Sequence, residues 1–201
     1  MAKRRRERKW ERVIYTRYAD DMVVLIDGHP RWQPHVVQIS KRLEVELKKV
    51  EVELNEEKSR VVELSAGGSF GFLGFDLREA KNRMGKRFIL RTPMKKKQVE
   101  LLRRVAEILR FSRHRKLKEV LERLRPVIVG WVNYFRVGNC AQAFDQIRFE
   151  VLRKVRRFAM RRRGRCGFGW KRWSSKTIYK EWGLVNAYQV QYFYRSPAKV
   201  L

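Results

Sequence analysis

Apolar and polar positions follow two different periods along the chain, and the change falls near Arg91. Before it, short apolar runs rich in β-branched and aromatic residues are typical of strands. They predict a strand, a tight turn and a strand within residues 13–25, and further strands at 59–64, 70–77 and 87–90. Between them, apolar residues spaced by three and four positions predict one helix over 36–54. The first half therefore reads β-β-α-β-β-β.

After Arg91 the period is helical. Thr92 and Pro93 are typical of a helix N-terminus, and an apolar stripe follows over 99–109. A second stripe over 117–124 is predicted to end at Pro126, and further helices are predicted over 127–135 and 141–160. The predicted fold class is α+β: a partial sheet with one helix, followed by an all-helical region, with a domain boundary near Arg91.

Charge changes this picture by pointing to a partner. Among the 201 residues, Lys and Arg outnumber Asp and Glu by 49 to 21, giving a formal charge of +28. Residues 92–201 hold a net +21 of that charge. Such an excess destabilises a compact chain by self-repulsion unless a polyanion binds, so nucleic acid is the predicted partner. The hydrophobic fraction of 44% supports a real core and argues against wholesale disorder.

The two cysteines, Cys140 and Cys166, are far apart in sequence and lack a CxxC or histidine cluster. They predict ordinary thiols in a reducing compartment rather than a zinc site or a disulfide framework. No apolar signal segment follows the basic start, and no apolar run is long enough to span a bilayer. We therefore expect a cytoplasmic protein with no membrane partner.

The most specific motif is Tyr18-Ala19-Asp20-Asp21, placed between two apolar runs. Adjacent carboxylates at a hairpin tip repel each other, and a divalent cation relieves that repulsion. Asp also favours turns for local reasons, so an ordinary acidic turn is the alternative interpretation.

Three further strings follow the motif in order: Leu54-Asn55-Glu56-Glu57-Lys58-Ser59, Phe70-Gly71-Phe72-Leu73-Gly74-Phe75 and Gly130-Trp131-Val132-Asn133-Tyr134-Phe135. Each string is weak alone. Together, the four resemble the C-terminal portion of a group II intron-encoded reverse transcriptase/maturase over about residues 13–180.

The resemblance implies roles for the matching positions. Asp20 and Asp21 would bind Mg²⁺, Lys58 would assist the outgoing pyrophosphate, and Phe72, Leu73 and Gly74 would shape the primer grip. It also implies a partition of the chain: a basic arm (1–12), a partial palm (13–91), thumb-like helices (92–125), a maturase-specific RNA-binding domain (126–180) and a C-terminal tail (181–201). The implied partners are structured intron RNA and an RNA/DNA duplex.

The chain departs from the family pattern before the motif. A complete enzyme has another metal-binding aspartate on an earlier strand, yet the 19 residues before Asp20 contain no Asp. Mg²⁺ needs several oxygen ligands, which one turn does not supply. We therefore expect the polymerase site to be incomplete, so that the chain alone is inactive unless a complementing N-terminal fragment supplies the rest.

The predicted RNA-binding residues are basic side chains of the second half. They are Lys95, Lys96, Lys97, Arg153, Arg156, Arg157, Arg161, Arg162, Arg163, Arg165, Lys171 and Arg172. No acid occurs between Val151 and Trp173, and aromatic residues are interleaved there, which suits phosphate contacts and base stacking. Phe158, Trp131 and Tyr134 are predicted to pack in the core. The glycines at 164, 167 and 169 predict a loop that orders only on binding.

Three hypotheses remain open at this level. The chain binds intron RNA and assists splicing with an incomplete polymerase site, or it is a polymerase completed by a partner or by lost upstream sequence. The third is a basic protein that binds nucleic acid without sequence preference.

Overall fold

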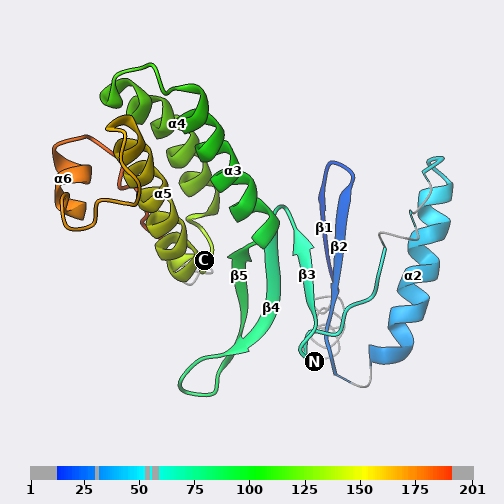
Figure 1. Ribbon diagram of the computed structural model, residues 1–201. Coiled ribbons are helices and arrows are strands. Elements are labelled where there is room, and N and C mark those ends of the chain that lie inside the picture. The colour runs from blue at the N-terminus through cyan, green and yellow to red at the C-terminus, as the bar shows by residue number, and fades with distance from the viewer. Residues whose placement is uncertain (1–12, 30–31, 53–54, 56–58, 192–201) are drawn as a thin grey trace, which may run out of the picture. The chain divides into compact units, whose positions relative to one another are not determined.

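The computed structural model describes residues 13–29, 32–52, 55 and 59–191. The chain divides into two compact units (Figure 1). Unit 1 comprises residues 1–73 and 77–89, and unit 2 comprises residues 74–76 and 90–201. The mixture of small antiparallel sheets and helices confirms the predicted α+β class.

Unit 1 begins with the predicted hairpin. Strands β1 (Val13–Tyr18) and β2 (Asp21–Ile26) pair antiparallel, with Val13 opposite Ile26 and Tyr18 opposite Asp21. This pairing confirms the strand–turn–strand prediction. β-Branched and aromatic residues favour such a pair because they pack well on a pleated surface.

Helix α2 (Gln33–Lys48) confirms the predicted helix but ends earlier than Leu54. Glu51 adopts a left-handed φ of +56°, and the backbone N–H groups of Val50 and Val52 both donate to the Leu47 carbonyl, so the helix closes there. The strand predicted at 59–64 is wrong. Its backbone enters a turn instead, in which Gly67 and Gly68 donate to the Leu64 and Glu63 carbonyls, 3.1 Å each.

A three-stranded sheet follows in the order β3 (Ser69–Phe72), β4 (Phe75–Lys81) and β5 (Arg87–Pro93). The prediction of one strand over 70–77 is wrong. Leu73 and Gly74 have φ values of +49° and +76°, which is the pattern of a type I′ hairpin turn, and the chain reverses there. The predicted pairing of 87–90 across the turn at 82–85 is confirmed, with Asn82 N–H donating to Lys86 O at 2.9 Å.

Unit 2 contains helices α3 (Lys95–Phe111), α4 (Leu117–Phe135), α5 (Ala141–Arg162) and α6 (Ser175–Lys180). Two predicted boundaries are wrong. Strand β5 runs through Pro93, and α3 begins after Met94, where the Gln98 side chain donates to the Pro93 carbonyl at 2.9 Å. Helix α4 continues through Pro126, which merges the two helices predicted on either side of that proline.

The proline in α4 is tolerated because of where it lies. Pro126 is exposed, and so is Glu122, the residue four positions before it whose carbonyl loses its backbone partner. Leu124 and Ile128, on either side of it, are fully buried. Each such buried side chain stabilises the helix position by about 1.5–3 kcal/mol, which offsets the roughly 3 kcal/mol cost of the proline.

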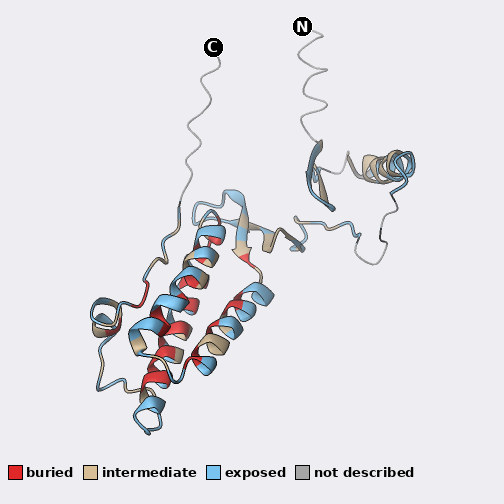
Figure 2. Cartoon of the chain, turned by 90° about the horizontal axis from the view of Figure 1, so that it is seen from above, coloured by how far each residue is buried: buried red, intermediate tan, exposed pale blue. Residues whose placement is uncertain are grey.

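The hydrophobic core lies between α3, α4 and α5 (Figure 2). Val105, Leu121, Phe144 and Val155 are among its fully buried side chains, and Phe158 is buried as predicted. No described residue before Pro93 is buried. Among the described apolar side chains of unit 1, Ile14, Tyr18 and Val37 are exposed, and others, such as Val23 and Leu43, are only half-buried. The core that stabilises the chain is therefore the core of unit 2.

Among the described helices, none is long and apolar enough to cross a membrane.

Candidate nucleic-acid interface

Asp20 and Asp21 lie at the tip of the β1–β2 hairpin. Asp21 begins β2, Asp20 precedes it in the turn, and both residues are exposed. Ala19 has a φ of +53°, which costs a non-glycine residue about 1 kcal/mol. Arg17 supports this strained turn by donating from Nε to the Ala19 carbonyl at 2.7 Å. The hairpin thus presents both carboxylates to solvent, as the motif predicts.

The described residues do not complete a Mg²⁺ site around this pair. Within residues 13–29, 32–52, 55 and 59–191, no group of three or more His, Cys, Asp or Glu side chains is arranged to hold a metal ion. Mg²⁺ requires near-octahedral oxygen coordination, and two adjacent carboxylates fall short of it. A catalytic or metal-binding role for Asp20 and Asp21 remains a prediction.

The other polymerase positions are less informative. Lys58 lies outside the described residues. Phe72 and Leu73 are half-buried, and Leu73 and Gly74 form the β3–β4 turn. Gly74 accepts a hydrogen bond from Met94 N–H at 2.9 Å, and its positive φ explains the glycine without a ligand. A primer-grip role for Phe72, Leu73 and Gly74 stays a prediction.

Lys95, Lys96 and Lys97 form the first turn of α3, and all three are exposed. Positive charge at a helix N-terminus opposes the helix dipole. Lys97 is compensated by Glu100 at 3.0 Å, and its hydrogen bond lowers the pKa of that carboxyl group. Lys95 Nζ donates to Gln146 Oε1 at 3.4 Å. These lysines are accessible to phosphate, though one is already paired.

The exposed basic residues that follow Val151 form what we call the α5 basic segment. They are Arg153, Arg157, Arg161, Arg162, Arg163, Arg165, Lys171 and Arg172. Arg153, Arg157 and Arg161 recur every four residues and therefore share one side of α5. The structure brings together most of the predicted RNA-binding residues here.

Carboxylates compensate part of the positive charge elsewhere in unit 2, but in this segment they pair with one residue among those described. Glu107 pairs with Arg103 and Arg104, and Asp145 pairs with Arg148. Within the segment, Arg153 pairs with Glu150 at 2.7 Å. Among the ion pairs that join described residues, none reaches the segment beyond Arg153. Its mutual repulsion is relieved only by counterions or a bound polyanion.

Arg156 departs from the prediction because its side chain is inside the domain. It is 1% exposed, and its Nη1 donates to the carbonyls of Trp173 at 2.6 Å and Gly169 at 3.2 Å. Its guanidinium carbon lies 4.3 Å from the ring centroid of Trp170. Burial lowers the pKa of Arg156. This residue holds the glycine-rich loop and is not available to contact RNA.

That loop is already folded against α5, whereas the sequence predicts ordering only on binding. Arg165 N–H donates to the Met160 carbonyl at 3.1 Å, and Trp173 N–H donates to Gly169 at 3.1 Å. Arg162, predicted to contact RNA, also donates from Nη1 to the Arg115 carbonyl at 2.5 Å. Arg162 therefore links the end of α5 to the α3–α4 connection as well as carrying charge.

The motif at the end of α4 is mainly a packing motif. Trp131 lies against Phe135 and Phe144, with ring centroids 4.7 and 5.8 Å apart, as predicted for a core residue. Tyr134 is more exposed than predicted, although it stacks on Phe75. Cys140 is buried and donates to the Phe135 carbonyl, and burial raises the pKa of its thiol to about 11. Cys140 and Cys166 are free thiols, as predicted.

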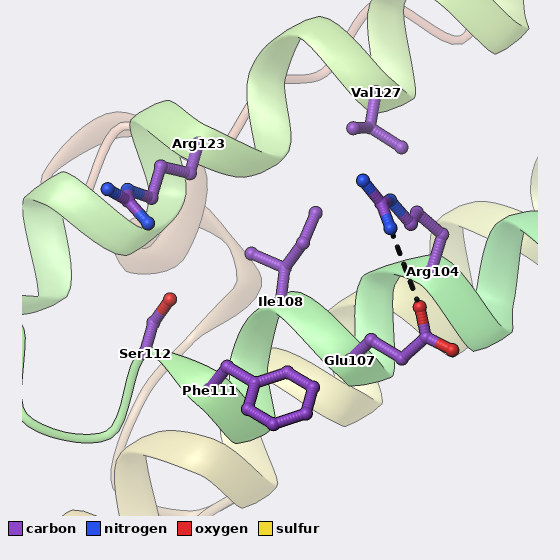
Figure 3. A pocket seen from close by; sticks show the side chains of 7 residues that line it. All are labelled: Arg104, Glu107, Ile108, Phe111, Ser112, Arg123 and Val127. Atoms are coloured by element: carbon purple, nitrogen blue, oxygen red, sulfur yellow. Dashed lines mark ion pairs between the residues drawn. The ribbon is translucent and has the colours of Figure 1, made fainter.

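Sequence reasoning missed two surface features of unit 2. One is a groove of about 380 Å³ between α3 and α4, floored by Ile108 and Val127 and flanked by Phe111 (Figure 3). Arg104 and Glu107 form an ion pair of 3.7 Å on its rim. The other is Phe149, a half-exposed ring on α5 that stacks on Trp170. The polar neighbours of Phe149 in sequence were the available signal for an exposed ring.

Comparison with known proteins gives one family match. Residues 99–182 match the family described as "Group II intron, maturase-specific domain". This region is therefore similar to the maturase-specific domain of group II intron proteins, and we call residues 99–182 the maturase domain after this match. The match confirms the predicted resemblance to the C-terminal part of a group II intron maturase. No curated protein matches the chain at a significant level.

The maturase domain contains most of the features described above for unit 2. Its matched range begins inside α3 and ends after α6, so it takes in much of the region that the resemblance assigned to thumb-like helices. Most of the buried core and the whole α5 basic segment lie within it. Lys95, Lys96 and Lys97 precede the matched range.

Substitutions of a buried and of an exposed arginine in the maturase domain are expected to differ in their effect on the free energy of unfolding. Arg156→Met should lower the free energy of unfolding by about 2 kcal/mol, because it removes the side-chain donor to the Trp173 carbonyl and one of the donors to the Gly169 carbonyl. Arg157→Met, one position along and exposed, should change it by less than about 0.5 kcal/mol. Urea denaturation of both variants measures this, and equal stability of the two would contradict the structural role of Arg156.

Proposed function

We propose that this chain binds group II intron RNA through its maturase domain, with the α5 basic segment on the RNA backbone. The observation that supports this is that the family match takes in the α5 basic segment, in which Arg153 is the one residue with a carboxylate partner among the described residues. Arginine makes bidentate contacts with phosphate oxygens, and the exposed guanidinium groups of Arg157, Arg161 and Arg163 are open to them.

The proposed consequence is assistance to splicing by stabilising the folded intron. A protein that binds only the folded form of an RNA shifts the folding equilibrium by mass action, and at a concentration a hundredfold above Kd the gain is about 2.7 kcal/mol. This mechanism needs binding surface rather than catalytic groups on the protein. It fits a domain whose described polar surface is dominated by arginine and lysine.

Generic electrostatic binding is the alternative, and it makes a different prediction. Non-specific binding comes almost entirely from counterion release and treats all RNAs of equal length alike. Specific binding retains a preference for intron RNA over unrelated RNA at moderate salt. A filter-binding titration with both RNAs therefore separates the two, and equal affinity would leave only the generic interpretation.

The charge-neutralising variant Arg157→Gln/Arg161→Gln/Arg163→Gln tests the proposed surface. For binding to intron RNA, the plot of log affinity against log salt should lose about two units of slope, because each lost phosphate contact removes about 0.7–0.9 units. The measurement is a salt titration of Kd with the full chain.

Two controls accompany that titration. Arg103→Gln/Arg104→Gln/Arg115→Gln removes the same charge, but from side chains paired with Glu107 and Glu119, so its slope should change less. Asp20→Ala should leave RNA binding nearly unchanged, since Asp20 lies in unit 1. A slope lost equally in both triple variants, or binding abolished by Asp20→Ala, would contradict the proposed surface.

RNA-directed DNA polymerisation is a second candidate, favoured by one specific observation. The strained turn at Ala19 presents two carboxylates, and the described residues around it lack a buried core of their own. Such a half-built layer is suited to completion by further polypeptide. We propose that any polymerase activity requires a complementing reverse-transcriptase fragment that carries the other metal-binding aspartate.

Primer extension tests this second candidate. The chain alone, supplied with Mg²⁺, template–primer and nucleotides, should give no extension, because its described residues do not complete the metal site. Addition of an N-terminal reverse-transcriptase fragment should give extension that Asp20→Ala abolishes. Extension that is insensitive to Asp20→Ala, or absent with the fragment, would rule out this role for the hairpin.

A further inference from the structure

Phe149 and Trp170 form an exposed aromatic pair on the maturase domain. Phe149 comes from the middle of α5 and Trp170 from the glycine-rich loop, and their rings lie 6.0 Å apart between centroids with planes only 13° from parallel. They are 52% and 46% exposed. Phe168 extends the group, with its centroid 6.3 Å from that of Trp170. We call Phe149, Phe168 and Trp170 the aromatic platform.

The buried guanidinium of Arg156 holds the platform in place. Its Cζ lies 4.3 Å from the Trp170 ring centroid, and its hydrogen bonds to the Gly169 and Trp173 carbonyls fix the backbone on both sides of that ring. One face of the indole is thus occupied from within the domain, while nearly half of the residue remains open to solvent. A ring fixed before binding loses little conformational entropy on binding.

The surroundings of the platform are cationic. The guanidinium carbons of Arg153 and Arg157 each lie 5.9 Å from the ring centroid of Phe168. Lys171 and Arg172 follow Trp170 directly, and both are exposed. A nucleotide bound with its base on the platform would place its phosphate among these side chains. Arg153 is paired with Glu150 at 2.7 Å, whereas Arg157 has no ion pair among the described residues. Exposed rings beside such positive charge combine the two elements that single-stranded nucleic acid requires.

We propose that the aromatic platform is a stacking site for an unpaired base of the bound RNA. The inference rests on the proposed RNA-binding function and adds the class of RNA element that is bound: a bulge, loop or end. Bases inside an A-form duplex are stacked on each other and are not accessible to such a ring. A second protein copy fits the surface less well, since burying the platform against apolar side chains would also bury Arg157 without a carboxylate.

Paired and unpaired RNA probes test the site with the full chain. One probe is an RNA stem with an unpaired bulge, and the other is the same stem fully paired. Phe149→Ala and Trp170→Ala should each weaken binding of the bulged stem about tenfold without changing its salt slope, because stacking releases few counterions. Binding of the paired stem should stay unchanged. Trp170→Phe should restore most of the lost affinity.

The controls keep the test decisive. The Arg156 guanidinium packs on the ring of Trp170, so Trp170→Ala removes a contact that holds the loop. Phe149→Ala leaves that contact in place and therefore remains informative if Trp170→Ala disturbs the loop. Phe111→Ala is the matched control, because Phe111 is 67% exposed on α3 with the Arg110 guanidinium 4.6 Å from its ring centroid. It should not affect binding of either probe.

Several results would overturn the proposal. The first is an equal loss of affinity for the bulged and the paired stem in the platform variants. The second is an equally large loss of affinity in Phe111→Ala. The third is a platform variant that dissociates a self-associated protein while its RNA affinity is unchanged. If the wild-type chain binds intron RNA with the expected salt slope but ignores the platform variants, only the stacking site fails. If it binds no RNA, the proposed function fails as well.

Discussion

The repulsion among positive charges on the maturase domain is the constraint on which the rest of its structure depends. Most of the α5 basic segment has no carboxylate partner among the described residues, so its arginines repel one another in the free protein. The side chains packed between α3, α4 and α5 oppose that repulsion, with Val105, Leu124 and Val155 fully buried. The hydrophobic core thus holds a surface that becomes favourable only when a polyanion neutralises it.

Arginine serves both the interior and the charged surface of this domain, and Arg156 is the interior case. Its neighbours Arg153 and Arg157 face solvent, whereas Arg156 donates to two loop carbonyls and lies against Trp170. It therefore connects the helical core to the loop that carries Trp170, Lys171 and Arg172. Phosphate contacts and base stacking, as proposed, both rely on this buried guanidinium.

Sequence patterns predicted the parts of the fold that depend on local regularity. The β1–β2 hairpin and α5 follow from β-branched runs and a helical stripe. The patterns failed where tertiary contacts decide: Pro126 reads as a helix end, yet the burial of Leu124 and Ile128 carries α4 through it. Leu73-Gly74 reads as strand because only its backbone angles reveal the turn. Residues 59–64 pair with no strand among the described residues, so their apolar run does not form one.

In the candidate site, too, sequence patterns predicted the local features and missed those that depend on tertiary contacts. The basic segment was identified from the absence of acids between residues 151 and 173. Arg156 was included wrongly, although a signal was available: it lies four residues after Leu152 and three before Ala159, both of which are buried on α5. Phe149 was missed because its partner, Trp170, is brought to it only by the folded loop.

Ultraviolet cross-linking of the full chain to intron RNA, followed by peptide mapping, tests the central claim most directly. The account predicts that most cross-linked peptides come from residues 149–173, which hold the α5 basic segment and the aromatic platform. Cross-links concentrated in residues 13–48, with none from 149–173, would contradict it.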